Sequence, residues 1–321
     1  MQKPDLVKET HSVDYDVTIV GAGPAGLSAG IHLSRAKYRV LLLDKESFGG
    51  QIMNVEWIKD FPGPSERVSG AILASAMVNE AEECGVHMEL GEVVEIESYS
   101  GCKSVRCADG RAHTSSVVIV AGGLRARKLR VPGEDRFEGK GMIHCALCDA
   151  GLYAGQAVAV CGGGHAGIIE ALYFANHASK VYVIEVQPGL SASPALQERA
   201  CANSKLEIRC EERIVEIVGD EFVTGVQVQN ATTGRKDILS VSGVLAHVGF
   251  DAATDYLEGV LSLDDRGGIV VNQNFETDVS GILAAGDIRS ESLRRVAAAV
   301  SEGKTAAMSA QRFLQSLQQE G

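Results

Sequence analysis

A pattern of strand, glycine loop, helix, strand and acidic residue occurs twice in this chain of 321 residues. The first copy has the loop 21–26 and ends at Asp44, and the second has the loop 162–167 and ends at Glu185. In both copies the acid follows the first glycine by 23 residues (44 − 21 and 185 − 162). The pattern is typical of a βαβ unit that binds a dinucleotide, and a repeat in one register is stronger evidence than a single copy. The sequence therefore predicts an α/β fold with two Rossmann-like nucleotide-binding domains.

The first copy reads Gly-Ala-Gly-Pro-Ala-Gly between a β-rich apolar run at 16–20 and a helical pattern at 27–35. Its first glycine permits a tight turn, its second lets backbone amides approach a pyrophosphate, and its third lets helix and strand pack closely. The helix N-terminus offers free N–H groups, and the acid can accept hydrogen bonds from a ribose. The residues expected to bind the nucleotide are Gly21, Gly23, Pro24, Ala25, Gly26 and Asp44.

The second copy reads Gly-Gly-Gly-His-Ala-Gly between an apolar run at 157–161 and a helical pattern from Ile168. Two interpretations stay open: the copy binds a nicotinamide nucleotide, or it keeps the βαβ fold without that ligand. The loop is less regular around His165, which we expect to be a loop or cap residue and not a catalytic base. The candidate nucleotide-binding residues are Gly162, Gly164, His165, Ala166, Gly167 and Glu185.

Composition argues against several other classes of protein. Hydrophobic residues make up 45% of the chain and charged residues 22%, which is ordinary for a globular protein, and the length suggests two domains. The net charge of −12 argues against a nucleic-acid surface, and no apolar run reaches the roughly 20 residues that span a bilayer. The eight cysteines are scattered, and only one pair is closely spaced, so we expect a reduced, cytoplasmic chain. We also expect that it interacts with neither nucleic acid nor membrane.

The closely spaced cysteines lie between the two glycine loops, in the string His-Cys-Ala-Leu-Cys-Asp at 144–149. The Cys-x-x-Cys-His order of a covalent haem site is absent, and a structural zinc site would need a second cysteine pair. The spacing favours a redox dithiol of Cys145 and Cys148, and we expect no metal site. Reducing a disulfide takes up two protons, so Asp149 is a candidate acid and base; the alternative is that it caps a helix or turn.

With these motifs, the chain resembles the low-molecular-weight thioredoxin reductases, class II pyridine nucleotide-disulfide oxidoreductases, over essentially its whole length. The resemblance rests on the first glycine loop, the Cys-x-x-Cys-Asp string and further segments at 49–52, 61–63, 121–123, 281–287 and 294–296. It implies an FAD-binding domain at 1–128 and 251–321, with a pyridine-nucleotide-type domain at 129–250 inserted in it and carrying the dithiol. The further residues that it places on FAD are Gly50, Gln51, Gly122, Gly286, Asp287, Arg294, Arg295 and Val296.

The resemblance also implies a mechanism. Electrons pass from a nicotinamide to the flavin and then to the disulfide at Cys148, the flavin-proximal sulfur. Cys145 is then the thiol that attacks a thioredoxin-like protein substrate, with Asp149 as acid and base. The family rotates its smaller domain between two positions, which predicts hinges near 129–132 and 248–251, and it suggests a homodimer.

One departure from the family concerns the electron donor. NADPH-using relatives carry a basic His-Arg-Arg string and a further arginine where this chain has Glu185, Val186, Gln187 and Ser191. A carboxylate would repel a 2′-phosphate and accept hydrogen bonds from an unphosphorylated ribose, so we predict NADH rather than NADPH. A disulfide reductase supplied by ferredoxin or reduced flavin, a flavin oxidase, and a slow redox-sensing flavoprotein remain alternatives. Arg295 replaces a usual glutamine, and it faces either the flavin or solvent.

Two helices complete the expected architecture. The pattern at 69–84 predicts a helix with Ile72, Leu73 and Met77 facing inward. The amphipathic run at 294–317 predicts a C-terminal helix that supports the core and a dimer.

Overall fold

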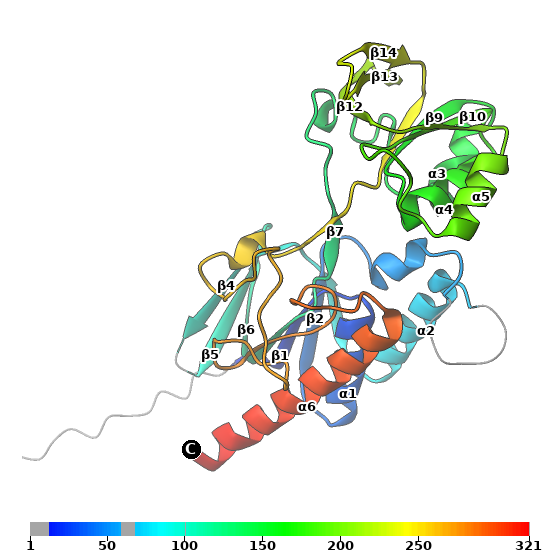
Figure 1. Cartoon of the computed structure of the whole chain (residues 1–321). Coiled ribbons are helices and arrows are strands. Elements are labelled where there is room, and N and C mark those ends of the chain that lie inside the picture. Colours follow the sequence, from blue (N-terminus) through cyan, green and yellow to red (C-terminus); the bar gives the residue numbers. More distant parts are fainter. Residues whose placement is uncertain (1–12, 59–67, 100, 321) are drawn as a thin grey trace, which may run out of the picture. The chain divides into compact units, whose positions relative to one another are not determined.

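The structure is a computed structural model that describes residues 13–58, 68–99 and 101–320 (Figure 1). The chain divides into two compact units, Met1–Leu124 with Ala252–Gly321, and Arg125–Asp251. The expected motif at 61–63 lies outside the described residues. Each unit contains one of the two glycine loops.

The first unit is built on a seven-stranded sheet in the order β3-β2-β1-β6-β5-β4, with β17 also paired to β6. The pairs β1–β2, β2–β3, β1–β6 and β6–β17 are parallel, whereas β4–β5 and β5–β6 are antiparallel. Because β17 pairs with β6, the C-terminal part of the chain completes the sheet begun by the N-terminal part. The strands are β1 (Tyr15–Val20), β2 (Val40–Asp44), β3 (His87–Leu90), β4 (Val93–Tyr99), β5 (Cys102–Cys107), β6 (Ala112–Val120) and β17 (Ile282–Ala284).

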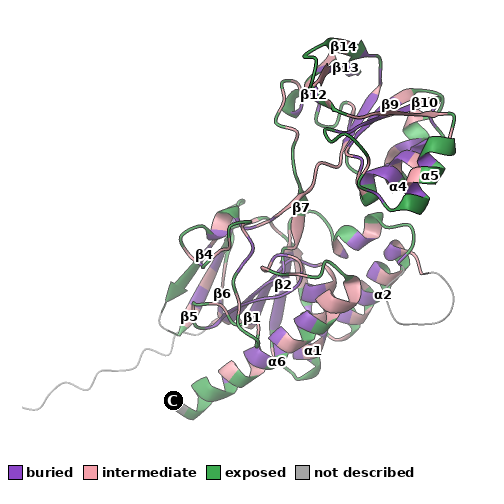
Figure 2. Ribbon diagram, in the orientation of Figure 1, coloured by how far each residue is buried: buried purple, intermediate pink, exposed green. Residues whose placement is uncertain are grey.

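Two hydrophobic clusters make up most of the core of this unit. One packs α1 (Pro24–Arg35) and α6 (Val296–Glu320) against the sheet, and its residues include Leu27, Ile31 and Ala307. The other cluster includes Leu41, Val118 and Ile282 of β2, β6 and β17. The buried parallel strands follow the apolar runs in the sequence (Figure 2). The remaining elements of the unit are α2 (Gly70–Glu83), η1 (Gly50–Asn54) and η4 (Asp255–Leu257).

The second unit has a parallel sheet in the order β11-β10-β9-β15-β8 and a separate antiparallel sheet, β12-β13-β14. One cluster packs α4 against the parallel sheet, and a second packs the antiparallel sheet against it. The unit therefore has three layers. Its main strands are β8 (Met142–Ile143), β9 (Ala157–Cys161), β10 (Lys180–Ile184), β11 (Leu206–Arg209), β12 (Glu212–Gly219), β13 (Val223–Asn230), β14 (Lys236–Leu239) and β15 (Gly243–Ala246). Its helices are α3 (Ala146–Asp149), α4 (His165–Phe174), α5 (Pro194–Ala202), η2 (Asp135–Phe137) and η3 (Ala150–Tyr153).

Two connecting segments, β7 (Leu124–Ala126) and β16 (Phe250–Ala252), pair with each other where the chain passes from one unit to the other. Arg127 donates to Asp251 through Nε at 3.1 Å and Nη2 at 2.5 Å, which joins the two segments a second time. The predicted hinge regions lie at or beside these segments.

The structure confirms the predicted α/β fold and corrects two local predictions. Both helices after the glycine loops begin three residues earlier than expected, at Pro24 and His165, because the end of each loop forms the first helical turn. In α2, Met77 is buried and Leu73 half-buried, but Ile72 is 67% exposed and does not face inward. Apolar residues cover a wider arc of this helix than the face that packs against the rest of the unit, so some of them, such as Ile72, are exposed.

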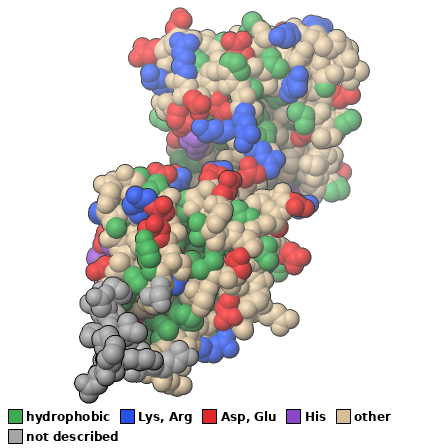
Figure 3. Space-filling model, turned by 90° about the vertical axis from the view of Figure 1, so that its left-hand side faces the viewer, with side chains coloured by type: hydrophobic (Ala, Val, Ile, Leu, Met, Phe, Trp, Pro, Cys, Tyr) green, Lys and Arg blue, Asp and Glu red, His purple; other side chains and the backbone are tan. Residues whose placement is uncertain are grey.

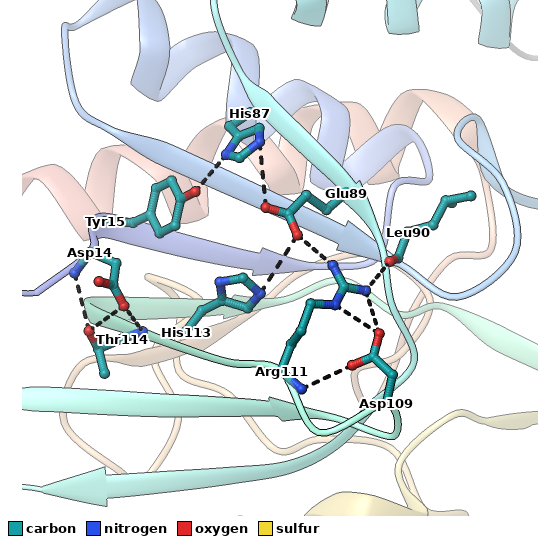
Figure 4. Close-up of polar contacts among 9 residues, drawn as sticks. All are labelled: Asp14, Tyr15, His87, Glu89, Leu90, Asp109, Arg111, His113 and Thr114. Carbon is teal, nitrogen blue, oxygen red and sulfur yellow. Dashed lines mark hydrogen bonds and ion pairs between the residues drawn. The ribbon is translucent and has the colours of Figure 1, made fainter.

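A polar cluster in the first unit joins residues of β1, β3 and β6 with the turn that precedes β6 (Figure 4). The hydroxyl of Tyr15 lies 2.5 Å from Nδ1 of His87, and the carboxylate of Glu89 accepts from Arg111 at 2.6 Å. Burial, and secondarily the charge of Glu89, raises the pKa of Tyr15. The cluster spans the length of the strands, since Tyr15 begins β1 whereas Leu90 ends β3 and pairs with Asp44.

Candidate active site

Cys145 and Cys148 form a disulfide at the start of α3, with their Cα atoms 5.4 Å apart. Cys145 is the N-cap of this helix, and its sulfur accepts a hydrogen bond from the Cys148 amide at 3.1 Å. Cys145 is 6% exposed, whereas Cys148 is exposed. The two cysteines of the disulfide therefore differ in their exposure to solvent.

Neighbouring groups fix the dithiol helix. The peptide N–H that joins Cys145 to Ala146 donates to Oε2 of Glu170 on α4 at 3.3 Å. Asp149 is half-buried at the end of α3, and its amide donates to the Cys145 carbonyl at 3.1 Å. Burial, and secondarily the charge of Asp149, raises the pKa of Tyr153. Asp149 therefore lies in the same helical turn as the dithiol, and its charge acts on Tyr153.

The first glycine loop has the geometry expected of a nucleotide site. Gly21 has φ +109°, and a Cβ there would lie 2.3 Å from the Ala121 carbonyl oxygen, so both its conformation and its space require glycine. The Asp44 carboxylate accepts from the Ala22 amide at 2.8 Å and from the Glu46 amide at 3.2 Å. No side chain caps the N-terminus of α1 at Gly23, which leaves amides of its first turn for an anion.

Other residues expected to bind the same cofactor lie beside this loop or further along the chain. The Gly49 amide donates to the Ala22 carbonyl at 2.9 Å, which brings Gly50 against Gly23, and Gln51 donates to the Leu124 carbonyl. A Cβ on Gly286 would lie 2.9 Å from that of Ala25 in the first turn of α1. The remaining residues expected to contact FAD differ in burial. Asp287 is half-buried, as is Val296 at the start of α6, whereas Gly122, Arg294 and Arg295 are exposed.

Two residues that the sequence analysis did not single out hold the segment around Gly286. The Glu302 carboxylate accepts from the Gly286 amide at 2.9 Å and from Nε of Arg289 at 2.8 Å, and Glu302 is 7% exposed. Arg289 also stands over the Phe275 ring. The sequence gives no local signal of this contact, because Glu302 is sixteen residues beyond Gly286 and meets it only once α6 packs against the sheet.

The second glycine loop repeats the backbone pattern of the first. Gly162 has φ +111°, and the Glu185 carboxylate accepts from the Gly163 amide at 2.5 Å and from the Gln187 amide at 2.9 Å. The Ser191 amide donates to the Gly163 carbonyl at 3.0 Å, as Gly49 does to Ala22. Gly164 caps α4, His165 and Ala166 are exposed in its first turn, and Gly167 is buried.

Side chains distinguish the second loop from the first. Glu185 is 7% exposed, whereas Asp44 is half-buried. A Cβ on Gly163 would lie 2.5 Å from Cδ2 of Leu190, so the Leu190 side chain fills the space that the Ala22 side chain takes in the first loop. The Ser191 hydroxyl lies 3.7 Å from the Cβ position of Gly164, where the first loop has Gly50 without a side chain.

Acidic groups dominate the region beyond the second strand of this copy. The Glu211 amide donates to the Gln187 carbonyl at 3.0 Å, which places Glu211 beside the segment that follows Glu185. The nearby cation Arg209 is already held by Glu212 at 2.7 Å and Asp237 at 3.2 Å. Glu211, which is remote from Glu185 in sequence, therefore adds a second negative charge beside this segment.

The structure brings the dithiol and the second loop together in one unit and places the first loop with 286–289 in the other. Among the described residues no group of three or more His, Cys, Asp or Glu is arranged to hold a metal. In the described part of the chain, no helix combines the length and apolarity needed to cross a membrane. Acidic and basic side chains are interspersed on the face drawn in Figure 3.

Comparison with known proteins defines the class. A family model described as pyridine nucleotide-disulphide oxidoreductase matches residues 15–303, and the chain belongs to this family. It is 34% identical to thioredoxin reductase of Peptoclostridium litorale, covering 94% of this chain and 98% of the relative, and 33% identical to that of Bacillus subtilis, covering 95% and 96%. A crystal structure of Lactococcus lactis thioredoxin reductase matches with a TM-score of 0.86 and 31% identity, over 94% of this chain and all of the other. Within the family, this protein is an oxidoreductase of the thioredoxin-disulfide reductase type.

Proposed function

We propose that this protein reduces a thioredoxin-like protein through the Cys145–Cys148 dithiol, with FAD on the first unit and NADH as the electron donor. The observation that carries the proposal is the disulfide at the start of α3, with one sulfur buried and one exposed, in a unit that also has a glycine loop. Six free cysteines elsewhere suit a reducing, cytoplasmic setting. By family resemblance we also propose a homodimer.

The residues of the first unit fit FAD. The loop between β1 and α1 presents backbone where a pyrophosphate would lie, since a Cβ on Gly50 would come within 2.7 Å of the Gly23 Cα. Asp44 would hold the adenosine ribose through its carboxylate, and Gly286 with Asp287 would hold the ribityl and phosphate part. When bound, FAD would supply two-electron transfer to the disulfide. The chain's own part is to fix this loop through Asp44, and 286–289 through Glu302.

The two sulfurs have different roles in this proposal. Cys148 is exposed, which supports its role as the sulfur first reduced. Cys145, released as a thiol, is the nucleophile toward the substrate disulfide, and it must leave its buried position as the N-cap of α3 to reach that substrate. Asp149 holds the proton that the leaving thiolate needs.

NADH is favoured over NADPH by the surroundings of the second loop. Glu185 accepts from two amides at the end of β10, where the acid of such a unit would bind the adenosine ribose, and Glu211 lies beside the same segment. A 2′-phosphate would meet these carboxylates, while Arg209 is held by Glu212 and Asp237. Burying an additional negative charge against carboxylates is unfavourable, which selects against NADPH.

A second candidate is a disulfide reductase that uses no nicotinamide. The Ser191 hydroxyl lies against the second glycine loop where the first loop is bordered by a glycine, and the larger Leu190 side chain takes the space that Ala22 occupies in the first loop. A ferredoxin-flavin thioredoxin reductase of Clostridium acetobutylicum also matches, with 28% identity over 95% of this chain and a TM-score of 0.52. In this candidate the second copy keeps its fold and holds the dithiol.

Anaerobic titration of the purified yellow protein with NADH, NADPH and reduced ferredoxin, followed by thioredoxin reduction, tests the donor. We expect NADH to bleach the flavin faster than NADPH. Equal rates with both would refute the charge argument, and bleaching by ferredoxin alone would establish the second candidate.

The Cys145→Ser variant tests the role of the dithiol. We expect a loss of at least about 10³-fold in disulfide reduction, because the attacking sulfur is gone, while flavin reduction by the donor persists. Turnover with oxygen that is unchanged and exceeds disulfide reduction in the parent protein would instead identify a flavin oxidase. Slow disulfide turnover in the parent would identify a redox sensor.

A further inference from the structure

The duplicated units allow a residue-by-residue comparison around their glycine loops. The Ala121 amide donates to the Val20 carbonyl at 2.7 Å, and the His247 amide donates to the Cys161 carbonyl at 2.7 Å, so His247 takes the place of Ala121. Both residues follow the strand that pairs with the first strand of the copy. On the helices, Glu170 takes the place of Ala29, because each is eight residues beyond the first glycine of its loop (170 − 162 and 29 − 21).

These two replacements produce one contact. Nε2 of His247 lies 3.0 Å from Oε1 of Glu170, and their side chains are 11% and 20% exposed. Both ring nitrogens of His247 are buried and neither makes a hydrogen bond among the described residues, so Nε2 meets Glu170 as an ion-pair contact. The other carboxylate oxygen of Glu170 accepts from the peptide N–H between Cys145 and Ala146. A chain of contacts thus runs from the residue that packs beneath Gly162 and Gly167 to the dithiol.

The fold itself does not require this pair. In the first unit the same backbone positions hold Ala29 and Ala121, which are 0% and 5% exposed. Burying a histidine and a carboxylate loses hydration that two alanines never had, so the pair adds a cost that its position must offset. The feature that the second unit has at this place, and the first unit lacks, is the dithiol helix.

We propose that Glu170 and His247 are positioning residues for the Cys145–Cys148 dithiol and set its redox equilibrium. Glu170 binds the peptide N–H that follows Cys145 and so places a carboxylate at the turn that holds the dithiol, and His247 orients Glu170. The inference rests on the proposed redox role of the dithiol. A carboxylate near a thiol disfavours its thiolate. Glu170 therefore disfavours the thiolate of the reduced pair. This keeps the dithiol from being so stable relative to the disulfide that it no longer passes its electrons to the substrate.

The decisive variant is Glu170→Gln, which keeps an acceptor for the Ala146 amide and removes the charge. At a pH where a thiolate forms, we expect the dithiol to be favoured about 10-fold over the disulfide relative to the parent protein, a shift of about 30 mV for two electrons. Glu198→Gln on α5 is the matched control, because Glu198 is exposed in the same unit, and its equilibrium should stay within twofold of the parent.

The measurement equilibrates the full chain with mixtures of reduced and oxidised dithiothreitol, traps the thiols and quantifies the Cys145–Cys148 disulfide. It does not depend on turnover. A Glu170→Gln equilibrium within twofold of the parent protein would overturn the inference. Failure of the proposed function is distinguishable, since it would appear as a Cys145→Ser variant that still reduces thioredoxin.

A double-mutant cycle with Glu170 tests the contribution of His247. His247→Ala should shift the equilibrium in the parent protein and cause no further shift in a Glu170→Ala background, because His247 acts through Glu170. An equal shift in both backgrounds would refute that coupling. The double variant reproduces the alanine pair of the first unit, and thermal unfolding checks that it folds. If Glu170→Gln does not fold, the double variant provides the same test of charge.

Discussion

The two glycine loops share one backbone and differ in what surrounds it. In each, an acid at the end of the second strand accepts from the amide of the loop's second residue, and a later amide donates back to that residue's carbonyl. The first loop is bordered by glycines at 49 and 50, and the second by Leu190 and Ser191. The hydrogen-bonding frame therefore defines a nucleotide-type fold, whereas the bordering side chains decide which ligand, if any, it accepts.

The largest expected effect comes from removing the close helix–strand approach in each loop. A Cβ on Gly26 would lie 1.9 Å from the Gly21 carbonyl oxygen, and a Cβ on Gly167 would lie 2.1 Å from that of Gly162. Gly26→Val should cost about 3 kcal/mol of local packing, which corresponds to about 100-fold weaker FAD binding. Gly167→Val is the matched variant and should retain FAD but lose reduction by NADH. The ratio of absorbance at 450 and 280 nm measures the bound flavin. Loss of FAD in both variants would show that the loops are not independent.

A second difference is the buried ion pair that holds the first unit's C-terminal segment. Glu302 binds both the Gly286 amide and Arg289, so Glu302→Ala leaves a largely buried guanidinium without its carboxylate. We expect a loss of about 3 kcal/mol in the free energy of unfolding, together with weaker FAD binding. Chemical denaturation with and without added FAD measures both. Glu83→Ala on α2 is the control, because Glu83 is exposed in the same unit, and an equal loss there would rule out a specific clamp.

The donor prediction can be sharpened by giving the second loop the charges it lacks. In Glu185→Gln with Ser191→Arg, the amide can still accept from Gly163 while the carboxylate is removed and a cation is added. We expect the ratio of kcat/KM for NADPH to that for NADH to rise about 10-fold, or about 1.4 kcal/mol. Ser191→Arg alone should give a smaller rise. Activity with neither nucleotide, before or after substitution, would favour the donor without nicotinamide.

The sequence was sufficient for the parts of the molecule that depend on local pattern. Both βαβ units, the dithiol and the acids at 44 and 185 follow from spacing, because glycine and the strand–helix period act over a few residues. Glu302, Glu170 and His247 could not be assigned in this way, since their partners are 16, 24 and 77 residues distant (302 − 286, 170 − 146 and 247 − 170). Alignment of the two copies offers one signal for such residues. An alanine in one copy opposite a charged residue in the other marks a contact that the shared fold does not need.

The smallest expected effect concerns the strand residue just before each loop. Val20 and Cys161 occupy equivalent positions, and burial raises the pKa of the Cys161 thiol to about 12 from an ordinary value of 9.0. The native state then holds this proton more tightly than the unfolded chain. Its contribution to stability is complete below about pH 9 and declines as the pH rises toward 12, by at most about 1.4 kcal/mol per unit. Cys161→Val copies the first unit and should remove this decline. The free energy of unfolding at pH 8 and pH 10 therefore should differ by about 1 kcal/mol less in the variant than in the parent protein. If the free energy of unfolding depends on pH equally in both proteins, the Cys161 thiol is not the group responsible. The strand residue before the second loop would then contribute no more to the pH dependence of stability than Val20 does before the first.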